Sequence, residues 1–431
     1  MGVLDDEKVF KDPIHSLVRV NDDLIWKLIQ TPEFQRLRRI KQLGGTHIVY
    51  STAEHSRFSH SLGVYFIAKR MMDVLNKEKK EKFNDEERML VLCASLLHDV
   101  GHGPFSHSFE SVLGIDHEVF TRRILLEDTH IFRLLEGYKP GFSKSVSAVI
   151  EKTYPDQLIV SLISSEIDAD RLDYLLRDSY FTGTPYGEID LERILRTMRI
   201  KNERIVFKHS GMHAIEDYLF SRYQMYWQVY LHDCSLSFNF LIESLLSRLR
   251  YLIAEGYNFK CDVKLFKEIF KTDVDLASYL RMDDGVVTTF AGFFLEENDE
   301  ILRDLAHRFL SRGLFNEFDY VPNEDSDRLF GELTELIKNA GIDPNYYVLQ
   351  FRYEQSPYDY YEGKTGDVIE ILAEDGSVCE ISSTSNIIKG IANSPKLKNT
   401  LFLPLKRIKE AENRDEILEK IKEMIGRSVD V

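Results

Sequence analysis

Apolar residues recur at helical spacing through most of the first 310 residues of the chain. The stretch 31–43 opens with a capping threonine and a proline and ends at a glycine pair, which predicts a helix between them. The stretch 85–98 is apolar on nearly every side after its first turn, as in a helix buried at the centre of a domain. Similar spacing predicts helices over 165–178 and over the aromatic-rich stretch 213–250, the second interrupted near His232.

The last third of the chain has a different pattern, which begins with a polar connector over 319–327. The elements predicted beyond it are a helix, three strands and a terminal amphipathic helix, over 330–340, 346–353, 367–373, 377–381 and 414–425. Asp375 and Gly376 lie between two of these strands and are a signal for a hairpin turn. A short β signal also occurs earlier, at 205–208.

Together these elements predict a mainly α fold with a small α+β C-terminal appendage. We place the boundary near residue 320, so that 1–320 forms a helical domain and 321–431 an α+β region of unknown role. The sequence contains neither an internal repeat nor a low-complexity segment, so a repeat architecture is excluded.

The composition of the chain excludes several classes of function. The chain has 431 residues and a net charge of −16, which disfavours bulk nucleic-acid binding. Its four cysteines show no close spacing, so neither a disulfide scaffold nor a cysteine zinc site is expected. The first residues do not resemble a signal peptide, and no apolar run approaches the ~18 residues that span a bilayer. We therefore expect a cytoplasmic protein without membrane contact.

The candidate chemistry begins with the adjacent residues His98 and Asp99. An isolated pair of this kind is most often a core histidine beside a capping aspartate. Here Asp99 ends an almost wholly apolar helix, so its carboxylate is predicted to be buried. Burying that charge costs several kcal/mol, on the order of the penalty for an unpaired ion, unless it is paired or binds a metal. A metal bound by Asp99 would offset this cost, so we take the pair as part of a candidate metal site.

Two donors are too few for a catalytic metal, which usually takes three or four protein ligands. The further candidates are His60 and one acid of the predicted helix 165–178. A set of imidazole and carboxylate donors suits Fe, Mn, Zn, Ni or Co better than an ion that prefers thiolates.

At this point the sequence resembles a known family. The ordered set His60, His98-Asp99 and Asp170 is similar to the metal signature of the HD superfamily of phosphohydrolases. The strings that carry a closer resemblance are FQRLRRIKQLGG (34–45), HSRFSHSLG (55–63), LLHDVGHGPFSH (96–107) and IDADRLDYLLRD (167–178). They are similar to the deoxynucleoside triphosphate (dNTP) triphosphohydrolases, above all the HD domain of the vertebrate SAM-and-HD-domain enzyme and its bacterial relatives. The resemblance covers roughly residues 8–310.

The resemblance implies a fold and a catalytic set. It implies an HD-type helical core over most of 1–320 and metal ligation by His60, His98, Asp99 and Asp170. A divalent ion is expected there, with Mg²⁺ possible at the substrate phosphates. His102, His107 and His117 match catalytic histidines of the family, and Glu110 stands where the family has a supporting aspartate. A histidine suits protonation of the 5′-oxygen leaving group, and which of the three donates stays open.

The resemblance also implies substrate contacts. The phosphate-binding cations are Arg57, Arg171 and Arg222, and Arg171 stands where the vertebrate enzyme has a lysine. The residues matched to sugar binding or sugar packing are Gln42, Asp178 and Tyr230, and Tyr174 is a further candidate for substrate binding. On a helix, Asp170, Tyr174 and Asp178 form one polar stripe, because they are four positions apart. Tyr226 replaces a family histidine near the base, so the base preference stays open.

A regulatory site is the last expectation. Lys8, Val9 and Arg38 match contacts to an activating nucleotide in the vertebrate enzyme, which assembles as a tetramer. A local cationic patch in an otherwise acidic chain supports this site, and its members are Lys8, Lys11, Arg36, Arg38, Arg39 and Lys41. Gln30 replaces the aspartate that reads guanine there, so a strict requirement for GTP is not expected. The resemblance implies a homo-oligomer, a nucleotide-activated homotetramer.

Two other functions remain open on the sequence alone. One is a different HD-type phosphohydrolase, acting as a nucleotidase or phosphodiesterase. The other is a nucleotide sensor without turnover. Gln42, Arg57, Tyr174 and Tyr230 favour a dNTP substrate over the first alternative, and the complete set of metal ligands argues against the second.

Overall fold

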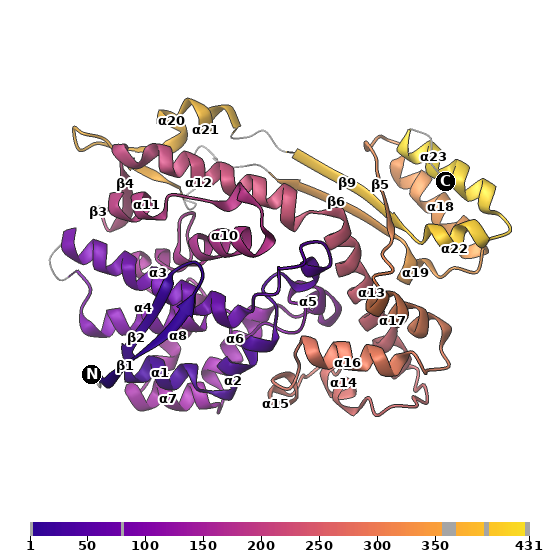
Figure 1. Ribbon diagram of the computed structural model, residues 1–431, viewed down its shortest axis with the longest axis horizontal. Helices are drawn as coiled ribbons and strands as arrows, with labels where there is room; N and C mark the ends of the chain where they lie inside the picture. The colour runs from indigo at the N-terminus through magenta and orange to yellow at the C-terminus, as the bar shows by residue number, and fades with distance from the viewer. Residues whose placement is uncertain (1–2, 79–81, 356–367, 392–395, 427–431) are drawn as a thin grey trace.

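The computed structural model describes residues 3–78, 82–355, 368–391 and 396–426. Helices dominate it and the sheets are small, which confirms the mainly α class (Figure 1). The helices of the first 310 residues form the larger body, from which a two-stranded ribbon of β6 (Leu349–Gln355) and β9 (Lys396–Leu403) leads to the C-terminal helices. None of the described helices is long and apolar enough to cross a membrane.

Three helices form the centre of the larger body. Helix α3 (Arg57–Glu78) packs against both α4 (Asp85–Leu97) and α10 (Ala169–Thr182). Every residue of α4 from Met89 to its end is buried, which confirms the central helix predicted over 85–98. Asn84 starts α4 with a capping box, because its side chain accepts backbone N–H groups that have no partner within the helix.

The prediction for 165–178 was correct in kind but not in its bounds, because the helix begins later and runs on to Thr182. Helix α10 begins at Ala169, and Asp168 caps it by accepting the backbone N–H of Arg171 at 2.7 Å. The other carboxylate oxygen of Asp168 accepts the N–H of Ser165, which therefore lies in the preceding loop.

The single helix predicted over 31–43 was wrong. Thr31 does cap a helix, but α2 (Pro32–Arg36) lasts little more than one turn and is followed by a 3₁₀ turn and extended backbone. The backbone N–H of Lys41 donates to the carboxylate of Asp284, more than 240 positions later in the chain. This long-range bond replaces the helical hydrogen bond that the local sequence favours.

The stretch 213–250 is broken where the sequence indicates. Helix α12 (Met212–Met225) passes into a π-helical turn over Tyr226–Tyr230, and α13 (Asp233–Ala254) follows. His232 caps α13 by accepting the N–H of Cys234. A π turn of this kind often marks a functional position in a helix.

The remaining helices surround this core and extend it toward the C-terminal end. They are α1 (Asp23–Ile29), α5 (His107–Leu113), α6 (His117–Leu126), α7 (His130–Tyr138), α8 (Phe142–Ile150), α9 (Gln157–Ser161), α11 (Leu191–Thr197), α14 (Lys264–Ile269), α15 (Leu276–Tyr279), α16 (Asp284–Phe294), α17 (Glu300–Ser311), α18 (Ser326–Asn339), α19 (Pro344–Tyr347), α20 (Ile381–Thr384), α21 (Asn386–Ile391), α22 (Leu405–Glu410) and α23 (Arg414–Ile425). The helix predicted over 414–425 coincides with α23, and the one predicted over 330–340 lies within the longer α18, apart from its last residue.

The strands form three small sheets. Strands β1 (Val3–Asp12) and β2 (Ser16–Asp22) make an antiparallel hairpin at the N-terminus. The second sheet has the order β3-β4-β7-β8 and the third has the order β5-β9-β6. The strands not yet given are β3 (Met198–Lys201), β4 (Arg204–Lys208), β5 (Asn316–Asp319), β7 (Glu370–Leu372) and β8 (Val378–Glu380).

The second and third sheets join the C-terminal region to the rest of the chain. Strand β7 pairs in parallel with β4, and β5 pairs antiparallel with β9. The predicted hairpin around Asp375 is present, with Gly376 at a φ of +83°. Asp367, in the strand predicted over 367–373, lies outside the described residues. The strand predicted over 346–353 is in part a helical turn, because Pro344 starts α19 and the strand begins only at Leu349.

Candidate metal centre and active site

Two histidines present their Nε2 atoms to one point between α3, α4 and α10. His60 lies on the first turn of α3, and its Nδ1 lies 2.8 Å from a carboxylate oxygen of Asp173. His98 follows the last residue of α4, and its Nδ1 lies 2.9 Å from the carbonyl oxygen of Ser95. An acceptor at Nδ1 fixes the neutral tautomer that carries its proton there. In both rings this leaves the lone pair of Nε2 to bind a further group.

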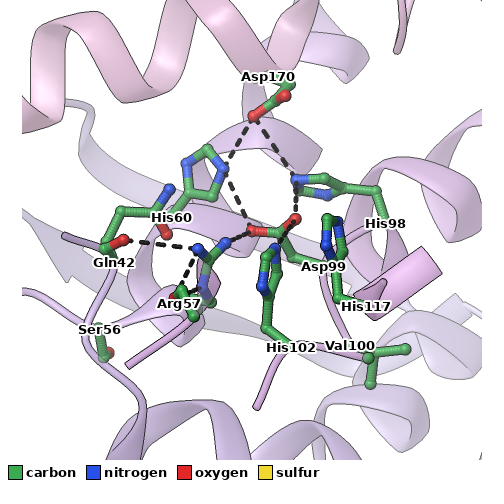
Figure 2. Close-up of polar contacts among 12 residues, drawn as sticks. Gln42, Ser56, Arg57, His60, His98, Asp99, Val100, His102, His117 and Asp170 are labelled. Carbon is green, nitrogen blue, oxygen red and sulfur yellow. Dashed lines mark hydrogen bonds and ion pairs between the residues drawn. The ribbon is translucent and has the colours of Figure 1, made fainter. Parts of the chain in front are cut away.

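Two aspartates face these nitrogens, as Figure 2 shows. One carboxylate oxygen of Asp170 lies 3.0 Å from Nε2 of His60 and 3.6 Å from Nε2 of His98. Asp99 lies 3.4 Å from Nε2 of His98 and 3.9 Å from Nε2 of His60. The structure therefore brings together all four residues that the sequence proposes as metal ligands.

The residues present fit a divalent cation. The Nε2 atoms of His60 and His98 are buried and make no hydrogen bond among the described residues, although both lie close to Asp170. The donor atoms of His60, His98 and Asp170 lie within 4.8 Å of one another, as the ligands of one ion do. A cation there would give both nitrogens a partner and offset two buried carboxylates.

The pKa shifts at these residues show how strongly the buried histidines and carboxylates interact. Burial lowers the pKa of His60, but the carboxylates of Asp170 and Asp173 outweigh it and raise the value to about 10. Burial raises the pKa of Asp99, but His98 and Arg57 hold it well below its usual range. With these carboxylates ionised, the His60 ring without a metal ion holds a proton on Nε2 as well, and an ion that binds there would displace that proton.

The three candidate catalytic histidines converge on Glu110. The Nδ1 atoms of His102, His107 and His117 lie 3.0, 3.2 and 3.1 Å from its carboxylate oxygens. The rings of His102 and His117 stack at 3.6 Å, and His102 also lies 3.4 Å from Asp99 at the metal cluster. Only the contact of His107 has the geometry of a hydrogen bond, so Glu110 orients that ring and lies close to the other two.

The three histidines differ in their surroundings. The side chain of His102 is 3% exposed, whereas that of His107 is 78% exposed. Burial, together with the nearby Arg57, lowers the pKa of His102 to about 4, so this ring is neutral at pH 7. A neutral ring is a poor proton donor at that pH, which leaves His107 and His117 as the stronger candidates for the general acid.

The loop after His98 depends on a close approach of α6. A Cβ atom at Gly101 would lie 2.3 Å from the carbonyl oxygen of His117 and 2.2 Å from the backbone nitrogen of Thr121. The guanidinium of Arg36, which is buried, donates to the carbonyl oxygens of Val100 at 3.0 Å and of His102 at 2.7 Å. These contacts place His117 against His102.

Arg57 lies beside the cluster, one turn of α3 before His60. Its guanidinium pairs with Asp99, and it donates to the hydroxyl of Ser106 at 3.0 and 2.8 Å. It also contacts the backbone carbonyl oxygen of Gln42 at 3.5 Å (Figure 2). Ser106 has a φ of +51°, a conformation that is costly for a residue with a side chain and that recurs at functional sites.

The two other candidate phosphate-binding arginines meet at Glu166. Arg222 lies 2.7 Å from this carboxylate, and Arg171 lies 3.6 Å from it and 3.5 Å from Asp168. Arg222 is almost fully buried, and Arg171 is partly exposed. The structure thus gathers the two guanidinium groups on one side of α10.

The candidate sugar-binding residues form a third group. Tyr230 donates its hydroxyl to one oxygen of Asp178 at 2.8 Å, and the ring of Tyr174 lies 6.3 Å from that of Tyr230. His55, to which the sequence analysis gives no role, contacts the other oxygen of Asp178 at 2.8 Å through Nε2. His55 stacks on Phe181 with ring centroids 4.7 Å apart. Its only local signal is its place at the start of the string HSRFSHSLG.

The candidate regulatory residues lie on the N-terminal hairpin and beside it. Lys8 and Val9 are in β1, and the side chain of Val9 is exposed. The guanidinium of Arg38 lies 3.5 Å from the centroid of the Phe58 ring, which also contacts Phe10 of β1. Arg38 and the hairpin are thus neighbours across one aromatic ring.

Comparison with known proteins agrees with this geometry. A family model described as HD domain matches residues 57–177, and one described as HD associated region matches residues 189–250. The uncharacterized protein YwfO of Bacillus subtilis is 47% identical over 428 residues, 99% of this chain and 98% of that protein. The structure of a phosphohydrolase of Bacteroides thetaiotaomicron is similar with a TM-score of 0.82 and 28% identity, over 92% of this chain and 100% of that one.

A protein named for dNTP hydrolysis is also similar. The deoxynucleoside triphosphate triphosphohydrolase SAMHD1 homolog of Dictyostelium discoideum is 34% identical over 250 residues, 54% of this chain and 48% of that protein. The matched HD-domain region holds the two histidines and two aspartates that the helical core brings together. The chain belongs to the HD-domain family of phosphohydrolases and resembles the dNTP triphosphohydrolases, which confirms the family predicted from the sequence.

Proposed function

We propose that this phosphohydrolase cleaves dNTPs into a deoxynucleoside and inorganic triphosphate, with a divalent ion held by His60, His98, Asp99 and Asp170. The observation that carries the proposal is the order of groups along α10. Asp170 lies at the metal cluster, Arg171 follows it beside Arg222, and Asp178 meets Tyr230 two turns later. Two helical turns span about 11 Å, so one helix presents groups for the metal, the phosphates and the sugar in sequence.

The reaction is the addition of water to the α-phosphorus with cleavage of the bond to the 5′-oxygen. Arg57, released from Asp99 to the substrate, would bind the α-phosphate, and Arg171 and Arg222 would bind the distal phosphates. The chemistry that a divalent ion supplies in such a site is a water of lowered pKa and stabilisation of charge on the phosphoryl oxygens. His107 or His117, both close to Glu110, would give a proton to the 5′-oxygen as the deoxynucleoside leaves.

Selection for the deoxy sugar belongs to the group around Asp178. The carboxylate of Asp178 is oriented by Tyr230 and His55, and it would accept a hydrogen bond from the 3′-hydroxyl. The rings of Tyr230 and Tyr174 lie next to it and would leave no room for a 2′-hydroxyl. Gln42, whose side-chain oxygen is buried without a hydrogen-bond partner among the described residues, completes this group.

The proposal includes nucleotide activation of a homotetramer. Lys8, Val9 and Arg38 are the residues proposed to contact the activator, and their place on and beside the N-terminal hairpin, outside the set of metal-ligand candidates, supports a second site. Gln30, where the vertebrate enzyme has the aspartate that reads guanine, supports an activator other than GTP alone.

The substrate class is tested with a panel of phosphate compounds. Purified protein loaded with Mn²⁺ is incubated with the four dNTPs, the four NTPs, dNMPs, a cyclic dinucleotide and bis(p-nitrophenyl) phosphate, with and without GTP. We expect turnover of dNTPs above all others. Turnover of a monophosphate or diester with dNTPs untouched would favour a nucleotidase or phosphodiesterase, and binding of dNTPs without any turnover would favour a sensor.

A further inference from the structure

The carboxylate of Asp173 lies at the centre of a buried network behind the metal cluster. One of its oxygens contacts Nε2 of His15 at 2.6 Å and Nη2 of Arg177 at 3.0 Å. The other contacts Nδ1 of His60 at 2.8 Å and Nε of Arg177 at 2.8 Å. Both oxygens therefore accept two hydrogen bonds, and the side chain of Asp173 is fully buried.

The same network extends to the turn of the N-terminal hairpin. Arg177 donates its remaining Nη1 to Asp12 at 2.8 Å. The other oxygen of Asp12 accepts the backbone N–H groups of Ile14 and His15, both at 2.9 Å, and thereby shapes the turn between β1 and β2. The turn is therefore tied to α10 both through Asp12 and through His15.

Helix α3 carries a glycine, Gly63, at the position where Asp173 and Arg177 pack against it. A Cβ atom at Gly63, one turn after His60, would lie 1.8 Å from a carboxylate oxygen of Asp173 and 2.6 Å from Nη2 of Arg177. Any larger residue would push these groups out of reach of His60. The absence of a side chain at Gly63 is what allows the carboxylate to reach behind the ring.

The position of Asp173 matters because of what it does to His60. A carboxylate at Nδ1 holds the ring in one orientation and keeps a proton on that atom, so that Nε2, which faces Asp170, is the nitrogen left to bind a metal ion. Asp173 is itself held by His15 and by two nitrogens of Arg177, so it has no freedom to turn away. A ligand held in this way loses less rotational freedom when it binds an ion.

We propose that Asp173 and His15 are positioning residues for the metal ligand His60, so that the turn of the N-terminal hairpin forms part of the metal site. The inference rests on the metal site of the proposed function but not on its substrate. It gives the hairpin, whose strand β1 also carries Lys8 and Val9, a direct connection to the metal through Asp12, Arg177 and His15.

The test measures metal affinity, not activity. Metal-free protein is titrated with Mn²⁺, and free Mn²⁺ is followed by electron paramagnetic resonance. Loss of a partner behind a metal-binding histidine typically weakens binding by about 10–100-fold. We expect this range for Asp173→Asn and for His15→Ala. His15→Gln, which keeps an N–H donor near the position of Nε2, should recover most of the affinity, and the exposed His130→Ala is the matched control.

The outcomes separate this inference from the proposed function. If folded His15→Ala and Asp173→Asn both bind Mn²⁺ as tightly as the parent, the positioning role is excluded. If Asp173→Asn does not fold, the comparison of His15→Ala with His15→Gln decides alone. A parent that binds Mn²⁺ with the expected variant effects, but hydrolyses no dNTP, would overturn the proposed substrate and leave this inference standing. A parent that binds no Mn²⁺ would overturn both.

Discussion

The hydroxyl of Tyr230 donates a 2.8 Å hydrogen bond to the buried carboxylate of Asp178. Tyr230 ends the π-helical turn between α12 and α13, whereas Asp178 lies on α10. The bond therefore ties the irregular turn to the helix that carries Asp170 and Arg171, and it fixes the tyrosine ring beside the proposed sugar site.

Replacing Tyr230 should weaken sugar selection. Tyr230→Ala removes the ring that excludes a 2′-hydroxyl, so the ratio of dNTP to NTP turnover should fall by at least about tenfold, or roughly 1.4 kcal/mol. Tyr230→Phe keeps the ring and should keep most of the selection. Tyr251→Ala, at an exposed position of α13, is the control. Selection that survives Tyr230→Ala unchanged would remove the tyrosine from the sugar site.

Replacing a metal ligand should abolish both the retention of the metal and the hydrolysis of substrate. His98→Ala and Asp99→Ala each remove a donor from the cluster, and we expect metal affinity to fall by more than the roughly 100-fold upper range for a partner behind a ligand. Metal content after dialysis and the hydrolysis rate are measured on the same samples, with His130→Ala as control. Full activity in a variant verified to be metal-free would sink the metal assignment.

Glu243 should make stability depend on pH. Burial against α5 raises the pKa of its carboxyl from 4.5 to about 7, despite hydrogen bonds from Ser111 and Ser108. The folded chain thus holds a proton that the unfolded chain releases at lower pH. The stability from this group is complete below about pH 4.5 and is lost as the pH rises to about 7.

Glu243→Gln lacks this loss. Relative to the parent, its free energy of unfolding should rise between about pH 4.5 and 7 and stay constant above, by about 1–2 kcal/mol after allowance for solvent screening, and its Tm should rise with it. Thermal unfolding is followed across that range, with the exposed Glu255→Gln as control. Parallel Tm curves for the parent and Glu243→Gln would contradict the raised pKa.

Arg38 should matter for activation and not for the chemical step. If a nucleotide at Lys8, Val9 and Arg38 favours the assembled state, Arg38→Ala should weaken activation by about 5–150-fold, or roughly 1–3 kcal/mol of coupling. Sedimentation and initial rates are compared with and without nucleotides. Unchanged assembly and activation-free kinetics in both parent and variant would remove the regulatory site.

Local patterns predicted the elements whose ends depend on local residues. The charged helix over 414–425 was found at its true bounds, because one amphipathic face and a following glycine suffice to define it. The helix over 31–43 was wrong because a carboxylate at Asp284 takes the N–H of Lys41. The local sequence around Lys41 cannot predict this contact, because Asp284 lies 243 positions away.

The residues of the candidate site also fall into those that the sequence predicts and those that only the structure reveals. The four metal-ligand candidates stand out in the sequence because a motif carries them. Asp173 and His55 were missed, since their roles arise only from contacts across the fold: Asp173 meets His15 from 158 positions away, and His55 meets Asp178 from 123 positions away. A polar residue at helical spacing looks like a solvated face until its partners are known.

The central claim is that water attacks the α-phosphorus of a dNTP and displaces the 5′-oxygen, so that the deoxynucleoside leaves and the triphosphate stays intact. The most direct measurement is hydrolysis by the metal-loaded protein in water enriched in ¹⁸O, with the products separated by ion exchange and weighed by mass spectrometry. The account predicts equal amounts of unlabelled deoxynucleoside and inorganic triphosphate, with one ¹⁸O atom in the triphosphate. Pyrophosphate and a deoxynucleoside monophosphate as products would contradict it.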